Sequence, residues 1–542
     1  MKSISSLFAA GVRGLNRREL FRSSGALAAG GFFGSGASGA AQLRIGAGIY
    51  QSIGVRPLIN CKGTFTVVTG SLTLPEVKRA MDEASRHYVH LDELMDAVGK
   101  RLAELTGAEF GIVAAGCAAA LAHATAACVA GADPEKLQRL PDLAGMKSEV
   151  ISPGYSRNVY DHAVRMLGVK IVTVETREEL ERAFSPRTAM VMVLGCPEDS
   201  GPLGLEIITQ LARPRGVPVL VDAAAEILTI PNVHLKRGAH MVAYSGGKCL
   251  RGPQCAGILL GQKDLVKAAW LHSAPHHAFG RPMKVGKEEI MGMLAAVEAW
   301  VKRDHEGEWK RWQSWLDHIA ARVGKVDGVA TEVLQPEGLS NRSPQLRLSW
   351  DGARLGIHGR EVAKILYETE PRIIFGGSSG DAREEGPSTI TIMPYMMNPE
   401  DAETVAERLY AILSRPPKID RPAAPPALAA NVAGQWDAQM EFFLGGAAHA
   451  FVFEQKGSEL VGTHKGDILA GDLRGTVEGN KIRFYSSHKY EGTRLNYEFE
   501  GRVDGDSMEG VVGMEEYGQA RWTAKRHEYG QPGGVVRPVK NA

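Results

Sequence analysis

The chain has few cysteines, and their spacing marks neither a metal site nor a redox site. Six cysteines are spread over 542 residues; no two form a CxxC pair, and none follows Cys255. An even number is compatible with disulfides in an exported protein, but this spacing requires none. The histidines at positions 272, 276 and 277 have no accompanying acidic pattern. They are interpreted as loop residues near an active-site rim, and no metal site is predicted.

An excess of charge of one sign is also lacking. The 63 lysines and arginines nearly balance the 62 acidic residues, which leaves a formal net charge of +1. This balance does not indicate a general nucleic-acid surface, although a local basic patch is compatible with a neutral total. Hydrophobic residues at 44% and charged residues at 23% are typical of a globular protein. The length predicts two to four domains.

The first 40 residues lack an apolar run long enough to favour a membrane-spanning helix. Residues 16–22, NRRELFR, are similar to a twin-arginine export signal, and a Gly/Ala-rich stretch follows to Ala40. Small residues at 38–40 are typical of a signal-peptidase cleavage site. We therefore expect a periplasmic or exported protein that folds before export, and no tRNA partner. The alternative is a disordered basic leader.

Residues 34–39, GSGASG, match a dinucleotide-binding fingerprint by spacing. No strand precedes them and they lie within the leader, so they are not interpreted as a nucleotide site.

The most informative residue is Lys248, in the glycine-rich segment 243–254. Asp222 follows an apolar run, and residues 240–245 and 257–261 are predicted to be two further buried strands. The ends of such strands meet at one edge of an open α/β sheet, where ligands bind. A lysine there can form a Schiff base with pyridoxal phosphate, while an aspartate keeps the ring nitrogen protonated. The alternative, a surface lysine after a buried strand, is disfavoured by these surroundings.

A phosphate cradle is predicted upstream of this pair. Residues 110–121 contain a strand, a turn of small residues and the start of an Ala-rich helix. The free amides of Gly116, Cys117 and Ala118 are candidates to hold a phosphate dianion with the help of the helix dipole. The order of cradle, acid and lysine along the chain strengthens each assignment.

With these residues the chain resembles the selenocysteine synthase-like family of fold-type I pyridoxal phosphate enzymes. It is more similar to the D-glucosaminate-6-phosphate ammonia-lyase branch than to the L-seryl-tRNA(Sec) selenium transferases. The similarity extends over about residues 50–415. The motifs that carry it are INCKGT (59–64), HLDEL (90–94), YDHAVR (160–165), SGGK (245–248), GPQ (252–254), GRPMKVGK (280–287) and IMPY (392–395).

The chain departs from the family pattern at two positions. Ala115 stands where the family often has serine, which puts one phosphate hydrogen bond in doubt. Gly247 stands where the selenium transferases usually have aspartate, which argues against the transferase reaction.

The resemblance implies roles for further residues. Ser245, three residues before the lysine, is expected to reach the cofactor phosphate, and His162 to stack on the pyridine ring; a structural role for His162 is nearly as well supported. Arg281 and Arg372 are candidate anchors for a phosphate and a carboxylate, because guanidinium binds both bidentately. Either arginine is alternatively a domain-interface ion pair.

In related enzymes the N-terminal arm reaches the active site of a neighbouring subunit. Asn60 and Thr64 are therefore expected at the substrate site of a homodimer or a larger homo-oligomer. Cys249, beside the lysine, is interpreted as a packed small residue rather than a redox group.

Alternating helices and strands predict a mainly parallel sheet with helices on both faces and a smaller α+β domain, followed by an all-β domain. Residues 432–525 show short alternating runs separated by glycine-rich turns, which predict an antiparallel sandwich or barrel with a filled core. The expected segments are a signal peptide (1–40), an arm (45–90), a large cofactor-binding domain (91–310), a small domain (311–415), a Pro-rich linker (416–430), the β-domain (431–527) and a tail (528–542).

The resulting hypothesis is an exported pyridoxal phosphate enzyme. Lys248 removes the α-proton of an amino acid or amino sugar acid, and a β-substituent is eliminated. The alternatives are selenium or sulfur transfer, which shares the first steps, and an inert enzyme domain that serves as a binding protein.

Overall fold

The structure is a computed structural model that describes residues 43–195, 201–381, 386–419 and 429–529. The expected signal peptide lies outside the described residues. The chain divides into two compact units, residues 1–57 and residues 58–542. In the described part of the first unit, a single 3-10 turn, η2 (Gln51–Ile53), ends at Gly54, whose φ of 81° suits a glycine. All elements below belong to the second unit.

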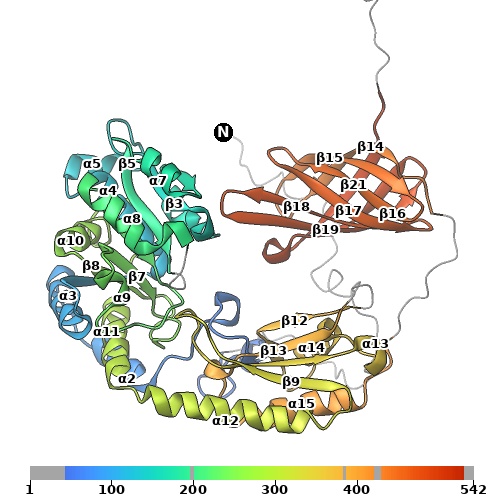
Figure 1. The fold of residues 1–542 in the computed structure, drawn as a ribbon, viewed down its shortest axis with the longest axis horizontal. Coiled ribbons are helices and arrows are strands. Elements are labelled where there is room, and N and C mark those ends of the chain that lie inside the picture. The colour runs from blue at the N-terminus through green and yellow to red at the C-terminus, as the bar shows by residue number, and fades with distance from the viewer. Residues whose placement is uncertain (1–42, 196–200, 382–385, 420–428, 530–542) are drawn as a thin grey trace, which may run out of the picture. The chain divides into compact units, whose positions relative to one another are not determined.

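A seven-stranded sheet forms the centre of the large domain, and Figure 1 shows it in blue to green. Six strands are parallel, and β8 alone runs antiparallel to both of its neighbours. The prediction of a mainly parallel sheet is therefore confirmed, with β8 as the strand that returns after the lysine loop. In spatial order the strands are β2 (Phe110–Ala114), β8 (Gly257–Gly261), β7 (Met241–Ser245), β6 (Val219–Asp222), β5 (Thr188–Leu194), β3 (Glu149–Pro153) and β4 (Lys170–Val174).

Helices of the large domain pack against this sheet and against each other. The Ala-rich helix α4 (Cys117–Ala130) is buried on nearly every side. Its small side chains allow close approach to the strands and to α10 (Lys263–Leu271). The remaining helices of eight or more residues are α2 (Pro75–Ser85), α3 (Leu91–Thr106), α8 (Leu205–Ala212) and α11 (Lys287–Lys302). Shorter helices are α5 (Pro134–Arg139), α6 (Asp161–Arg165), α7 (Arg177–Ala183) and α9 (Val233–Lys236).

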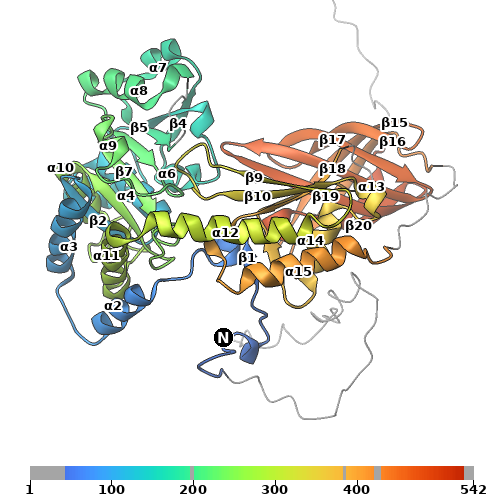
Figure 2. The same cartoon turned by 60° about the horizontal axis from the view of Figure 1, so that its bottom comes forward.

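The small domain is built on a separate hydrophobic core. Its four-stranded antiparallel sheet has the order β12 (Gly377–Ser379), β13 (Ser388–Ile392), β10 (Gln345–Trp350) and β9 (Val329–Leu334). Helices α12 (His305–Val323) and α15 (Asp401–Ser414) lie side by side in Figure 2. The domain also contains α13 (Gly352–Leu355) and α14 (Gly359–Glu368).

The segment predicted as an arm is divided between the two domains. Strand β1 (Ile59–Cys61) pairs in parallel with β11 (Ile373–Phe375), and Cys61 is part of the small-domain core. Helix α2 packs instead against α11 of the large domain. The segment therefore ties the two domains together through its own backbone.

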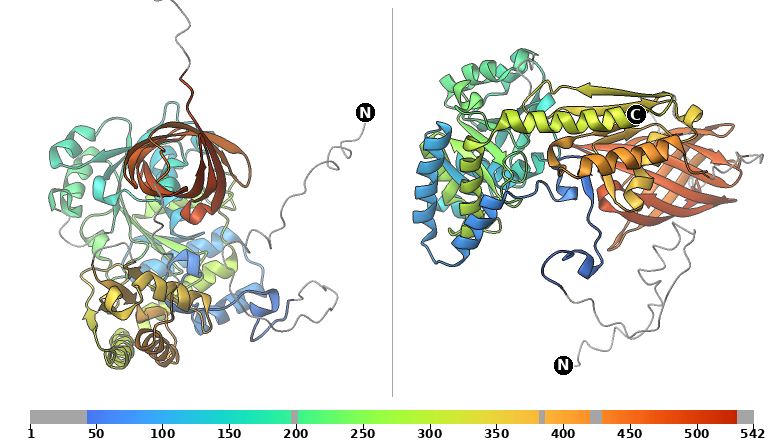
Figure 3. Two further views of the ribbon diagram at one scale, coloured as in Figure 1. Left: turned by 90° about the vertical axis from the view of Figure 1, so that its right-hand side faces the viewer. Right: turned by 90° about the horizontal axis from the view of Figure 1, so that it is seen from below.

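The C-terminal domain is a closed barrel of eight antiparallel strands, and the end-on view in Figure 3 (left) shows the ring. Of the two predicted alternatives, sandwich and barrel, the structure is the barrel. Inward-facing aromatic side chains, among them Trp436, Phe484 and Trp522, form a separate filled core, because residues alternate between the inside and the outside of each strand. The strands are β14 (Gly434–Glu441), β15 (Gly446–Lys456), β16 (Glu459–Lys465), β17 (Ala470–Glu478), β18 (Lys481–Tyr490), β19 (Thr493–Asp504), β20 (Ser507–Gly513) and β21 (Gln519–Arg526).

Within the described ranges, no helix is long and apolar enough to cross a membrane. The same residues contain no group of three or more histidine, cysteine or acidic side chains placed to hold a metal ion. The five described cysteines are free.

Candidate active site

Asp222 ends strand β6 at the carboxyl edge of the large sheet. Its side chain is only 5% exposed. The carboxylate oxygen Oδ1 accepts hydrogen bonds from the backbone amide of Ala224 at 3.1 Å and from the thiol of Cys117 at 3.6 Å. Burial raises the pKa of Asp222, and these two donors and the nearby charge of Lys248 partly oppose that rise. A buried acid of this kind favours a cationic partner.

Lys248 follows strand β7 in a tightly folded loop. The Gly246 amide donates to the Ala256 carbonyl at 2.8 Å, and the Arg251 amide donates to the Lys248 carbonyl at 2.9 Å. A Cβ added to Gly246 would lie 2.7 Å from that same Ala256 oxygen, so glycine is required here for close packing. Cys117 contacts Asp222 directly, and Lys248 lies near enough for its positive charge to act on the pKa of both groups.

The N-terminus of α4 faces this site and carries no side-chain cap. Gly116 is the N-cap residue, has a φ of 90° and would place an added Cβ in open space. The backbone on its other side is tightly packed, since a Cβ on Gly257 would lie 2.7 Å from the Cys117 amide nitrogen. Uncapped amides at a helix N-terminus bind phosphate well. Burial raises the pKa of Cys117 well above its usual range, so the thiol stays protonated and donates to Asp222.

The described residues therefore fit pyridoxal phosphate. The α4 amides are suited to its phosphate, Asp222 to a protonated ring nitrogen, and Lys248 to its aldehyde carbon. Ser245 lies at the end of β7, where its amide donates to the Ala224 carbonyl at 3.4 Å. Gly116, Cys117, Asp222, Ser245 and Lys248 lie at or next to the same edge of the sheet, and Ala118 follows on the first turn of α4. Their roles toward the cofactor remain predictions.

Residues of the small domain contact the loop that follows Asp222. The Asn341 amide donates to the Ala225 carbonyl at 2.8 Å. The Tyr395 hydroxyl donates to Asn341 Oδ1 at 3.1 Å and accepts a hydrogen bond from the Thr64 amide at 3.2 Å. Thr64 was predicted at the substrate site, and the structure places it in this chain of contacts. The sequence reasoning missed Asn341, which carries no motif signal, whereas Tyr395 belongs to the IMPY motif.

A buried acid near the site was also missed. Glu226 Oε2 lies 2.5 Å from His234 Nε2, and both side chains are almost fully buried. Gly195 directly follows β5, and a Cβ added to it would collide with the Glu226 carboxylate. The lack of a side chain at position 195 therefore leaves room for Glu226. No local motif in the sequence marks this pair.

Four other predicted residues have local partners or exposed positions. Asn60 accepts hydrogen bonds from the Lys62 and Gly63 amides at 2.9 Å and so shapes its own turn. The Arg372 guanidinium lies 3.8 Å from the Tyr367 ring centroid and donates to the Tyr367 carbonyl at 3.0 Å. His162 and Arg281 are exposed. The roles predicted for these residues remain predictions.

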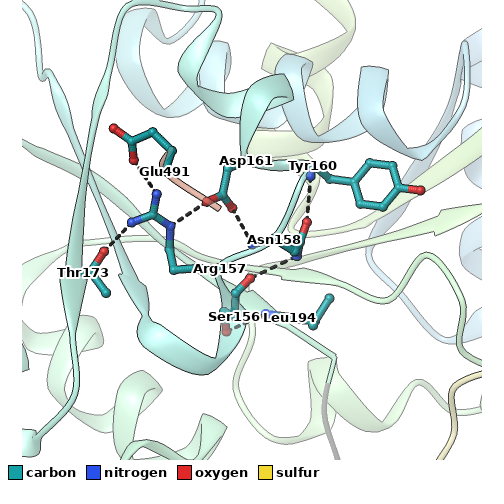
Figure 4. A network of polar contacts seen from close by, with 8 residues as sticks. All are labelled: Ser156, Arg157, Asn158, Tyr160, Asp161, Thr173, Leu194 and Glu491. Atoms are coloured by element: carbon teal, nitrogen blue, oxygen red, sulfur yellow. Dashed lines mark hydrogen bonds and ion pairs between the residues drawn. The ribbon is translucent and has the colours of Figure 1, made fainter. Parts of the chain in front are cut away.

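A polar network holds the loop between β3 and α6, and Figure 4 shows it. Arg157 pairs with the buried Asp161 at 2.5 Å, bonds to Thr173, and pairs with Glu491 of the barrel hairpin between β18 and β19. Burial opposes the charge of Arg157, yet its hydrogen bonds to Asp161 and Glu491 raise its pKa overall. The Ser156 hydroxyl accepts from the Leu194 amide at 2.9 Å, which ties the same loop to the end of β5.

We predict that Gly492→Ala will loosen this loop. An added Cβ at position 492 would collide with the Asn158 carbonyl and lie 2.6 Å from Asp161 Oδ2. Overpacking of this kind costs about 1–3 kcal/mol. Faster hydrogen exchange at residues 156–161 is expected by mass spectrometry. The control is Gly513→Ala, whose Cβ meets only an ordinary contact at 3.9 Å. Equal exchange in the two variants would show that the hairpin does not restrain the loop.

Comparison with known proteins connects this geometry to characterised enzymes. No family profile matches the chain. It is 30% identical over 382 residues to a 5'-C-glycyluridine monooxygenase-decarboxylase of a Streptomyces species, covering 67% of this chain and 92% of that protein. It is 29% identical to the D-glucosaminate-6-phosphate ammonia lyase of Salmonella typhimurium, covering 59% of this chain and 86% of that one.

Two further comparisons agree with these. An L-seryl-tRNA(Sec) selenium transferase of Moorella thermoacetica is 25% identical, covering 54% of this chain and 62% of that protein. A solved structure of D-glucosaminate-6-phosphate ammonia-lyase superposes with a TM-score of 0.60 at 27% identity, covering 67% of this chain and 98% of that chain.

Proposed function

The chain belongs to the selenocysteine synthase-like family of pyridoxal phosphate enzymes, and we propose that it catalyses α,β-elimination from an amino acid or amino sugar acid. The predicted fold class, the enzyme class of lyase or transferase, and the cofactor are confirmed by these relatives. The single observation that carries the proposal is the convergence of Asp222, Lys248 and the uncapped α4 N-terminus at one sheet edge.

Each group then has a distinct role. When bound, the cofactor supplies an electron sink for the negative charge that develops at the substrate α-carbon. Asp222 holds a proton at the ring nitrogen, and the protonated Cys117 thiol and the Ala224 amide keep that carboxylate oriented. The Lys248 amino group would hold the cofactor at its aldehyde carbon and, once free, would accept the α-proton of the substrate.

The elimination balances without an external oxidant. The α-proton passes to Lys248, and the electron pair of the broken Cα–H bond forms a double bond to Cβ. The β-substituent leaves with the electrons of its own bond. When it is a hydroxyl, the Lys248 ammonium returns the proton it took to the leaving oxygen, and water is released. Addition of water to the released unsaturated amine yields ammonia and a 2-oxo acid. Gly247 supports elimination over selenium transfer, because the chain lacks an aspartate at that position.

The test measures exchange and product release by the holoenzyme. Substrates with a β-hydroxyl, among them D-glucosaminate 6-phosphate and both enantiomers of serine, are incubated in D2O. We expect α-deuterium incorporation together with equimolar ammonia and 2-oxo acid. Ammonia formation without a 2-oxo acid, or no exchange with any amino acid, would overturn the proposal.

One relative favours a second candidate function. The Streptomyces protein is named for a monooxygenase-decarboxylase reaction and is 30% identical to this chain over 382 residues. An oxygen-dependent decarboxylation of an amino acid is therefore the second candidate. It predicts consumption of dissolved oxygen and release of CO2, neither of which accompanies elimination. An oxygen electrode and labelled-carboxyl release separate the two reactions in the same reaction mixture.

Export and assembly are also proposed. The NRRELFR segment supports twin-arginine export to the periplasm, and small-molecule substrates fit that location better than tRNA. A reporter fused to residues 1–45 should be exported, and a variant with Arg17→Lys and Arg18→Lys should stay in the cytoplasm.

A homodimer or larger homo-oligomer is expected by analogy with related enzymes, and sedimentation of the holoenzyme tests it.

A chain truncated after residue 427 is predicted to fold, bind the cofactor and retain α-proton exchange. The barrel has its own core, and every proposed catalytic residue precedes the linker. Loss of Glu491 removes one partner of Arg157. Asp161 and Thr173 still bond that guanidinium, so the loop and the bound cofactor are expected to persist. A folded, cofactor-loaded fragment that exchanges no α-proton would show instead that the barrel completes the active site.

A further inference from the structure

A large cavity is lined in part by Cys249 and Arg251 of the loop that carries Lys248. Neither Asp222 nor Lys248 is among its lining residues. Its volume is about 900 Å³, enough for a drug-sized molecule. One wall is the start of α12 and the other is the small-domain segment that carries Tyr395. The floor includes Cys249, the neighbour of Lys248, and Ala225.

Aromatic side chains dominate one wall of this cavity. Trp309, Trp312 and Trp315 follow each other at a spacing of three along α12, so they share one helix face. The Trp309 and Trp312 rings lie 6.3 Å apart, and Trp312 lies 6.3 Å from Tyr395. Trp312 and Trp315 also pack against neighbouring hydrophobic clusters. All three tryptophans line the cavity and are only partly buried, so they form an aromatic wall suited to a planar molecule.

The charge of the lining is strongly positive. Five lining side chains are lysine or arginine and two are glutamate. Arg303 donates to the Cys249 carbonyl at 2.8 Å, and Arg251 donates to the Leu72 carbonyl at 3.1 Å. Burial, and then the charge of Arg303, lower the pKa of Arg251. Glu308 of the lining and the nearby Glu76 oppose part of this effect on both guanidinium groups. The lining as a whole keeps an excess of cationic side chains, which favours a bound anion.

We propose that this cavity binds a planar aromatic anion, held by ring stacking on the α12 tryptophans and by charge pairing with Arg251 and Arg303. The proposal is independent of which reaction the enzyme catalyses. Because Arg303 also holds the carbonyls of Cys249 and Leu250, an occupant would contact the backbone that positions Lys248. The ligand is either the distal group of the substrate or a separate regulator, and the two share this chemistry.

Phenyl phosphate is the probe, added to the holoenzyme so that the cofactor already fills its own phosphate site. Calorimetry and tryptophan fluorescence are followed together. We expect saturable quenching, with inorganic phosphate and phenol each binding at least about tenfold more weakly, since each retains only one of the two recognition elements. Unchanged cofactor absorbance throughout the titration shows that the probe has not displaced pyridoxal phosphate.

Variants make the test specific. Arg251→Gln should weaken phenyl phosphate binding by about tenfold or more, as expected for loss of a charge-assisted contact, while Arg251→Lys recovers part of it. Trp309→Leu should weaken binding and reduce the quenching. The control is Arg347→Gln, an exposed arginine on β10 outside the cavity, which should leave affinity unchanged. Thermal melts confirm that each variant is folded.

The outcomes separate the two sources of ligand. If phenyl phosphate inhibits competitively with substrate, the natural occupant of the cavity is the distal group of the substrate. If it changes kcat at saturating substrate, the natural occupant is a separate regulator. Either outcome supports the site. Equal affinity in Arg251→Gln, Trp309→Leu and the control would overturn the proposal. It would also be overturned if acrylamide quenching of the tryptophans falls as protein concentration rises, because a second copy of the chain would then cover the cavity.

Discussion

Lys248→Ala is expected to leave a folded protein that no longer attaches the cofactor covalently. The wild-type lysine lies in a loop and contributes little to the hydrophobic core, so its truncation costs little stability. Borohydride reduction followed by peptide mass spectrometry should show the cofactor mass on the peptide containing Lys248 in the wild type and on no peptide in the variant. Substrate α-proton exchange should fall to background, since the group that accepts the proton is gone.

Lys100→Ala provides the matched control. Lys100 is an exposed lysine on α3 that pairs with Asp96, so its removal should change neither labelling nor exchange. If the Lys248→Ala protein still carries reduced cofactor on another peptide, a different lysine holds it and the assignment of the site fails.

Asp222→Asn is expected to retain the cofactor and to slow α-proton exchange by about 100- to 1000-fold, the range found when one preorganised electrostatic group is removed. Asparagine keeps an oxygen for the Ala224 amide and the Cys117 thiol, so the fold of the site should persist. It cannot stabilise a proton on the ring nitrogen, however, and a neutral ring is a poor electron sink. Exchange in D2O and cofactor content after gel filtration are measured on the same sample.

Cys117→Ala separates positioning from charge. It removes the thiol donor to Asp222 while leaving the carboxylate in place, so exchange should slow far less than in Asp222→Asn. Equal losses in the two variants would mean that the thiol contact, not the carboxylate charge, supports the reaction. Unchanged exchange in Asp222→Asn would make the acid purely structural.

Much of the site was predictable because its determinants are local. Strands β6, β7 and β8 are continuous apolar runs, and the residues at their ends follow directly from the chain. The predicted and observed boundaries of β8 agree, and β7 begins at Met241 rather than at 240. Strand β6 begins at Val219, two residues after the start of the apolar run at Val217. In the barrel the prediction identified the antiparallel meander, although glycine interrupts the alternation within β17 and β20.

The sequence by itself determined the parallel sheet, the glycine-rich loop that carries the lysine, the acid at the end of β6 and a separate all-β domain. These features follow from burial patterns and glycine conformations, which act over a few residues. Only the tertiary structure decided which distant side chains meet. Thr64, Asn341 and Tyr395 converge, Glu491 reaches Arg157, and Arg372 lies on Tyr367. These contacts depend on how separately folded cores pack and on the rotamers that packing allows, and no local periodicity encodes either.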